Sequence, residues 1–181
     1  MAHSSLQVSE RRRANRKGLA AFGVNANAYG SAGSFRTVRS GRKATIFTVG
    51  YEGRDGETLM SLLRDAGVDY LADIREKPIS RKPDFRATAL KTRCQESGIE
   101  YGEWTALGSP EELRDRLHES GDIEGFHKSF RRLAVRDRSE AVAKLASLVG
   151  KHTIALLCYE RCHDECHRMT IADLVADQTG A

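Results

Sequence analysis

The sequence of 181 residues contains no long apolar run. No stretch approaches the roughly 20 apolar residues that a membrane-spanning helix needs. The basic start of the chain, MAHSSLQVSERRRANRKG, is not followed by the apolar segment of a secretory signal. We therefore expect a cytoplasmic protein that has no membrane partner.

Cysteine is scarce, and its spacing excludes one common use. Three of the four cysteines lie in the stretch LLCYERCHDECHR, residues 156–168, and Cys94 lies far from them. A disulfide-stapled domain has more cysteines, spread along the chain. The clustering instead indicates thiol or metal chemistry inside a cell.

Acidic residues are almost missing from the first part of the chain. Residues 1–43 carry nine Lys and Arg against one Asp or Glu, a net charge of +8, whereas the remaining residues carry 20 against 24, a net charge of −4. The first part is also rich in Gly, Ser, Ala and Asn, so it has too little apolar surface to offset its chain entropy. We predict a basic, largely disordered tail over residues 1–43 and one domain over residues 44–181. The tail is either a segment that binds nucleic acid through its phosphates or a solubilising extension.

In the domain, short apolar runs alternate with amphipathic segments. The runs predict strands over residues 44–50, 68–75, 99–104 and 152–160. The amphipathic segments predict helices over residues 56–67, 86–98, 109–121, 124–135, 137–150 and 164–178. This alternation predicts an α/β fold, a three-layer sandwich with a mostly parallel, Rossmann-like sheet.

Polar residues follow the predicted strands, where α/β sheets bind their ligands. We expect one pocket there, with these substrate-binding candidates: Arg75, Tyr51, Ser80, Arg81, Tyr101 and Trp104. Asp73 lies within an apolar run and needs a partner when buried, which Arg75 or Arg168 can supply. A structural pair and a catalytic pair both remain open.

Four blocks of this sequence resemble a known family. FTVGYEG, LADIREKPISRKPDF, GIEYGEWTALG and LLCYERCHDECHR are similar, in this order, to the signature blocks of domain-of-unknown-function family 488, over about residues 45–176. The resemblance implies an α/β fold and a shared site, but it does not imply a reaction. The matching positions are Asp73, Arg75, Pro78, Ser80, Tyr101, Cys158, Glu160, Cys166, His167 and Arg168. The chain departs from the family pattern at Cys162 and His163, where the family often has Asp-Pro.

The cysteine loop permits several interpretations. A zinc site would use Cys158, Cys162, Cys166 and His163 or His167. The C-x3-C-x3-C spacing has one residue more than the C-x3-C-x2-C loop that holds the iron–sulfur cluster of radical-SAM enzymes. Cys162 and Arg168 formally fit the C-x5-R phosphate loop, although Asp164 and Glu165 between them would repel a phosphate. The loop also resembles the strand-end cysteine of rhodaneses, or its cysteines are simply buried small residues.

We interpret the loop as an active site that does not depend on a structural metal. The catalytic candidates are Cys158, Glu160, Cys166, His167, Arg168 and Asp73. Cys166 is the expected reactive thiol, because a helix N-terminus, His167 and Arg168 should lower its pKa. Cys162 should be dispensable. No cofactor is assigned, and zinc stays open as the alternative.

These residues predict an enzyme or ligand-binding domain for a small anionic, phosphate-bearing or nucleobase-like substrate, with nucleic-acid metabolism as one setting. Arginines would hold the anion, and aromatic rings would stack on a base. The alternative is a non-catalytic module that associates with nucleic acid or binds zinc.

Overall fold

The computed structural model describes residues 37–40 and 44–179. Five strands form one sheet in the order β1-β2-β5-β3-β4. The strands are β1 (Thr37–Ser40), β2 (Ala44–Gly50), β3 (Tyr70–Asp73), β4 (Glu100–Glu103) and β5 (Ile154–Cys158). Strands β2, β5, β3 and β4 are parallel, and β1 pairs antiparallel with β2 at the edge. The predicted α/β fold with a mostly parallel sheet is confirmed.

Strand β1 is an addition to the predicted elements. Thr37–Ser40 fall within the predicted basic tail, but these residues pair with Ala44–Phe47 of β2. Other tail residues, 1–36 and 41–43, lie outside the described part of the chain, and the expectation of disorder falls on them. Strand β1 was not predicted because it is only four residues long and lies at the edge of the sheet. Its hydrogen bonds come from β2, so it carries no long apolar run that would mark it in the sequence.

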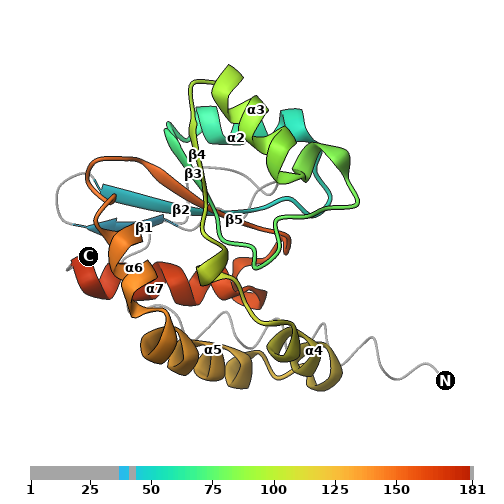
Figure 1. Cartoon of the computed structure of the whole chain (residues 1–181), viewed down its shortest axis with the longest axis vertical. Helices are drawn as coiled ribbons and strands as arrows, with labels where there is room; N and C mark the ends of the chain where they lie inside the picture. The colour runs from blue at the N-terminus through green and yellow to red at the C-terminus, as the bar shows by residue number, and fades with distance from the viewer. Residues whose placement is uncertain (1–36, 41–43, 180–181) are drawn as a thin grey trace, which may run out of the picture. The chain divides into compact units, whose positions relative to one another are not determined.

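Helices cover both faces of the sheet (Figure 1). Helices α2 (Gly56–Asp65) and α3 (Ala87–Glu96) cover one face, and their side chains share a core with Leu71, Ala155 and Leu157. Helices α5 (Ile123–Asp137), α6 (Ser139–Ala146) and α7 (His167–Thr179) cover the other face, in a core with Ile154 and Leu156. Successive residues of β5 therefore enter opposite cores, as a strand buried on both faces requires.

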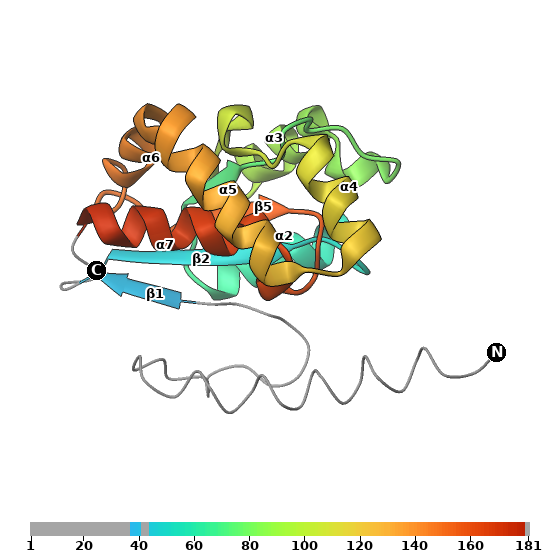
Figure 2. The same ribbon diagram turned by 90° about the horizontal axis from the view of Figure 1, so that it is seen from below.

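The order of strands places β5 at the centre. Strand β3 follows β2 in the chain, but β5 lies between them in the sheet. After β4, the chain passes through α4 (Glu111–Ser120), α5 and α6 before it returns to β5. Helices α5 and α7 run side by side (Figure 2). The carboxyl ends of β2, β5 and β3 are therefore neighbours, and the loop from β5 to α7 starts there.

The described helices do not resemble membrane spans. None of those between residues 44 and 179 combines the length and the apolar character that crossing a bilayer requires.

Candidate functional site

The predicted site residues form two separate groups at the carboxyl edge of the sheet. The first group, which we call the Asp73 network, contains Asp73, Arg75, Tyr51 and Tyr101. The second, which we call the Cys158 cluster, contains Cys158, Glu160, Cys166 and His167. Both groups are largely buried. They differ in how fully their polar atoms are paired.

Arg75 and Asp73 form a two-pronged ion pair. Arg75 donates from Nε to Asp73 Oδ1 at 2.8 Å and from NH2 to Asp73 Oδ2 at 2.5 Å. The hydroxyl of Tyr101 donates to Asp73 Oδ2 at 2.8 Å. Burial alone would lower the pKa of Arg75, but its hydrogen bonds and attraction to Asp73 outweigh burial and raise that pKa. Burial raises the pKa of Tyr101, and the charge of Asp73 raises it further.

The remaining NH1 group of Arg75 is also engaged. It donates to the carbonyl of Phe85 at 2.8 Å and to the hydroxyl of Tyr51 at 3.2 Å. The Tyr51 ring stacks on Phe85, with ring centres 4.3 Å apart. Each donor group of Arg75 therefore has a partner within the protein. The Asp73 network links β3 and β4 to Tyr51 and to the carbonyl of Phe85, which precedes α3.

The other predicted substrate-binding residues are dispersed. The Trp104 Nε1–H donates to the hydroxyl of Tyr70 at 3.2 Å, so its polar edge is engaged. The Ser80 hydroxyl accepts from the amide of Lys82 at 3.1 Å, within a turn. Arg81 is exposed in the same loop. The hydrogen bonds of Trp104 and Ser80 therefore join them to residues outside the Cys158 cluster.

The Cys158 cluster is assembled by the loop between β5 and α7. Cys158 ends β5, and Cys166 precedes the first residue of α7 in an extended conformation. Between them, His163–Glu165 forms a short 3-10 turn that folds the loop back. Gly50, at the end of β2, allows this loop to approach closely, because a Cβ atom there would lie 1.8 Å from the carbonyl oxygen of Glu160.

Four ligand-type atoms converge in the cluster. The two sulfurs, a carboxylate oxygen of Glu160 and a ring nitrogen of His167 all lie within 4.8 Å of one another. Nδ1 of His167 lies 3.6 Å from Cys166 Sγ and 3.9 Å from Cys158 Sγ. Its Nε2 lies 2.9 Å from the carbonyl oxygen of Ile74, to which it donates. The set of residue types fits a soft transition metal as well as thiol chemistry.

Electrostatics distinguish the two thiols. A hydrogen bond with Cys166, together with burial, raises the pKa of Cys158 well above its ordinary value. Burial opposes ionisation of Cys166, but the hydrogen bond from Cys158 and the charges of His167 and Arg168 hold the pKa of Cys166 well below its usual range. Burial, and then the negative charge of Cys166, raise the pKa of Glu160. Cys94, elsewhere on α3, is an ordinary core thiol whose pKa burial raises to about 12.

Arg168 lies beside the cluster and is incompletely paired. Its side chain is fully buried, and its NH2 donates to the carbonyl of Glu160 at 2.5 Å and to that of Cys162 at 3.4 Å. Its Nε and NH1, like Oε2 of Glu160, have no hydrogen-bond partner among the described residues. Buried polar atoms without partners are uncommon and costly. An ion or ligand bound here would supply the missing partners.

The structure departs from the predicted alternative metal set. Cys162 and His163 do not belong to the cluster formed by the described residues, whereas Glu160 and His167 do. Cys162 contributes its backbone carbonyl to Arg168. The ring of His163 pairs with Asp164 at 2.8 Å. Cys162 precedes the short 3-10 turn and His163 begins it, whereas the cluster residues come from the end of β5, the residue pair after it and the start of α7.

Three residues near the cluster are not among the predicted site residues: Arg54, Tyr159 and Arg161. The guanidinium of Arg54 donates to the carbonyl of Gly50 at 2.9 Å, and NH1 of Arg161 lies 3.7 Å from the Cβ position of Gly53. Tyr159 is 48% exposed and meets the Tyr51 ring edge-on. Their signal was available: Tyr159 and Arg161 flank Glu160, and Arg54 follows the glycine turn after β2. Their roles depend on loop geometry, which spacing alone does not give.

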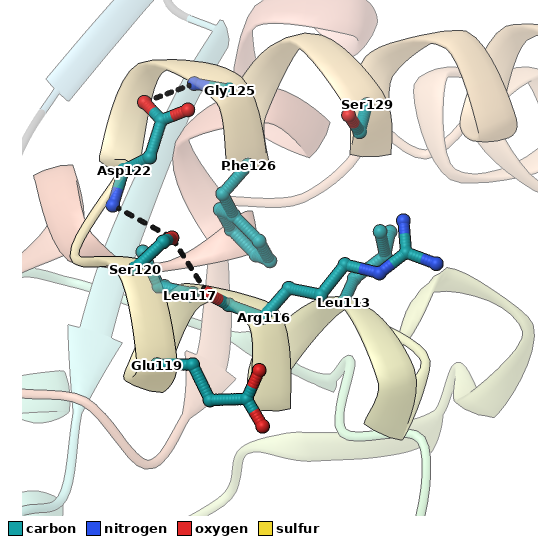
Figure 3. A pocket seen from close by; sticks show the side chains of 9 residues that line it. All are labelled: Leu113, Arg116, Leu117, Glu119, Ser120, Asp122, Gly125, Phe126 and Ser129. Carbon is teal, nitrogen blue, oxygen red and sulfur yellow. Dashed lines mark hydrogen bonds between the residues drawn. The ribbon is translucent and has the colours of Figure 1, made fainter.

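A separate hollow lies between helices α4 and α5 (Figure 3). Its volume is about 410 Å³, and its lining includes Leu113, Leu117 and Phe126. Asp122 caps α5 there by accepting from the amide of Gly125 at 2.9 Å. None of the predicted site residues lines this hollow, so it is not part of the predicted pocket.

The fold and the cluster define an α/β domain whose candidate site occupies the carboxyl edge of a parallel sheet. The family model described as "Domain of unknown function DUF488" matches residues 55–175, which is two thirds of the chain. The chain therefore belongs to this family, as the four sequence blocks predicted. A search of curated proteins and a search of solved structures each found no match.

Proposed function

We propose that this domain is an enzyme or binding protein for a small anionic, phosphate-bearing ligand. The ligand would bind at the turn after β2, beside the Cys158 cluster. The observation that carries the proposal is the incompletely paired guanidinium of Arg168, whose Nε and NH1 lack partners among the described residues. It is fully buried, and its NH1 lies 2.9 Å from the Cβ position of Gly50, at the start of that turn.

Two further arginines support this location. Arg54 and Arg161 flank the same turn, residues 50–54. Burial lowers the pKa of Arg54, and repulsion by Arg161 and Arg168 lowers it further, so the three positive charges lie close enough to oppose one another. A phosphate dianion placed among them would relieve this repulsion and form charge-assisted hydrogen bonds. The cluster lies beside the turn, so its thiols, carboxyl and imidazole are the groups available to act on the ligand.

Tyr159 supplies a candidate surface for a nucleobase. The predicted stacking residues Tyr51 and Tyr101 are engaged in the Asp73 network, whereas Tyr159 is half exposed next to Glu160. An exposed ring beside an anion site suits a nucleotide, because the base can stack while the phosphate meets the arginines.

Calorimetric titration with inorganic phosphate and with a nucleoside monophosphate tests this proposal. Arg161→Ala should weaken binding of both probes about tenfold or more, since a hydrogen bond to a charged group contributes about 1.5–3 kcal/mol. Tyr159→Ala should weaken the nucleotide selectively. Arg132→Ala, at an exposed position of α5, is the matched control and should leave both affinities unchanged. Equal binding by the parent and Arg161→Ala would contradict the assignment.

The basic tail provides a second candidate function. Its charge of +8, against −4 for the rest of the chain, favours contact with nucleic-acid phosphates. Binding of single-stranded RNA or DNA should fall steeply with salt and should be lost when residues 1–36 are removed. We also propose a cytoplasmic location, because the chain keeps four free thiols and a reducing compartment preserves them.

A further inference from the structure

We infer that Cys158, Glu160, Cys166 and His167 bind one zinc ion through Sγ, a carboxylate oxygen, Sγ and Nδ1. This inference goes beyond the anion-binding proposal and does not depend on it. The four donor atoms come from both ends of one ten-residue stretch and meet between β5 and α7.

The distances from the imidazole to the two sulfurs are close to those of a tetrahedral zinc site. With Zn–S bonds of about 2.3 Å and Zn–N bonds of about 2.05 Å, sulfur and nitrogen ligands of a tetrahedron lie about 3.6 Å apart. Nδ1 of His167 lies 3.6 Å and 3.9 Å from the two sulfurs, and all four donors lie within 4.8 Å of one another. The protein therefore gathers the four donor atoms around one point, where they can take the corners of a coordination tetrahedron.

The imidazole is oriented as a ligand. Its Nε2–H donates to the carbonyl of Ile74 at 2.9 Å, and this bond directs Nδ1 toward the sulfurs. A backbone acceptor on the far ring nitrogen is the usual support of a metal-bound histidine. The ring also meets Phe130 of α5 edge-on, with ring centres 5.4 Å apart, which restricts its rotation.

Charge balance favours a divalent cation at this position. Two thiolates and one carboxylate carry three negative charges, and a zinc ion reduces them to one. The guanidinium of Arg168, fully buried and lacking partners at Nε and NH1 among the described residues, supplies the matching positive charge. Oε2 of Glu160 is buried and has no hydrogen-bond partner among the described residues, so a metal ion beside it would give this oxygen a partner. The metal would thus compensate the charge of the buried carboxylate, which is costly without a partner.

The donor set selects the metal. Two sulfurs and one imidazole favour Zn²⁺ over the oxygen-seeking Mg²⁺ and Ca²⁺. Glu160 is the most exposed of the four ligands, since Cys158, Cys166 and His167 are each at most 6% exposed. It is therefore the ligand that a substrate or water molecule would displace first.

The test is zinc stoichiometry and affinity in the full-length chain, before and after treatment with a chelator. The parent should bind one zinc per chain, and Co²⁺ in its place should give the absorption bands of a tetrahedral thiolate site. Cys166→Ser and His167→Gln should lose that stoichiometric zinc. Cys162→Ser and Cys94→Ser, which remove thiols outside the cluster, should keep it.

Glu160→Gln keeps the test valid if the cysteine variants fail to fold. It preserves side-chain size and should weaken zinc affinity at least tenfold while circular dichroism stays that of the parent. Parent protein that takes up no zinc, cobalt bands that are not tetrahedral, or Glu160→Gln with parental affinity would each overturn the inference. Arg161→Ala should keep its zinc, so loss of phosphate binding in that variant and loss of zinc in the others report on the two proposals separately.

Discussion

The Asp73 network and the Cys158 cluster lie at the same edge of the sheet, and only one of them is chemically complete. In the Asp73 network, Arg75 uses its Nε, NH1 and NH2 groups, and both oxygens of Asp73 accept hydrogen bonds. Beside the Cys158 cluster, Glu160 and Arg168 keep buried polar atoms without partners among the described residues. Both regions contain a buried arginine and a carboxylate, yet only the first joins them directly.

This difference separates structure from function. A buried charge is tolerated when it is paired and hydrogen-bonded, and it is costly otherwise. The Asp73 network meets this condition with protein atoms alone, and its hydrogen bonds link β3, the loop at Phe85 and β4. The Cys158 cluster does not meet it, so selection for folding alone does not account for its residues. The proposed ion or ligand would meet the condition.

The largest expected effect comes from comparing the two arginines. In metal-free protein, Arg75→Met should destabilise the fold by about 3–5 kcal/mol, because it leaves the carboxylate of Asp73 buried without its cation. Arg168→Met should cost only about 1 kcal/mol, since it removes a cation that has no carboxylate partner and only two backbone acceptors.

Urea unfolding followed by circular dichroism measures both variants. The parent, stripped of metal, is the reference, because bound zinc would add its own stabilisation. Equal losses in the two variants would break the comparison and would mean that Arg168 is already satisfied within the chain.

An effect of opposite sign is expected at Glu160. In metal-free protein, Glu160→Gln replaces a largely buried carboxylate by a neutral group of the same size. It should raise the melting temperature by about 2–4 °C, the shift that about 1 kcal/mol produces in a domain of this size. With saturating zinc the order should reverse, because the parent alone gains the fourth ligand.

Differential scanning calorimetry with and without zinc checks this reversal. A carboxylate that serves only the fold would not change sign with metal. A variant less stable than the parent in both conditions would show that Glu160 is a structural residue.

The fold was predictable because its elements depend on local patterns. The run from Ile154 to Cys158 is apolar throughout, and the structure buries every residue of it in the central strand. Leu59 and Leu63 lie on one face of α2, four residues apart, as the helical period requires. Strand β1 was not predicted, because residues 37–40 show no apolar period and their place in the sheet depends on pairing with β2.

The site was only partly readable from the sequence. Titratable residues at strand ends predicted a polar edge, and Cys158, Glu160, Cys166 and His167 do meet there. The sequence offered Arg75 and Arg168 as alternative partners of a buried Asp73 and did not choose between them, because the two-pronged contact with Arg75 depends on side-chain direction. It also did not show that Arg54 and Arg161 approach the cluster, because that approach follows from the way the glycine turn and the cysteine loop fold against each other.

The smallest expected effect is at Cys162, which tests where the cluster ends. Its side chain is half-buried, its thiol lies outside the group of four donors, and its backbone carbonyl is the part that Arg168 contacts. Cys162→Ser keeps that carbonyl, so its free energy of unfolding should stay within about 0.5 kcal/mol of the parent. Cys162→Ser should also leave the rate at which iodoacetamide alkylates Cys166 in metal-free protein unchanged, because it keeps the other three residues of the cluster. Quantitative mass spectrometry of the alkylated peptides measures both rates, and slower alkylation of Cys166 in Cys162→Ser would extend the cluster to the centre of the loop.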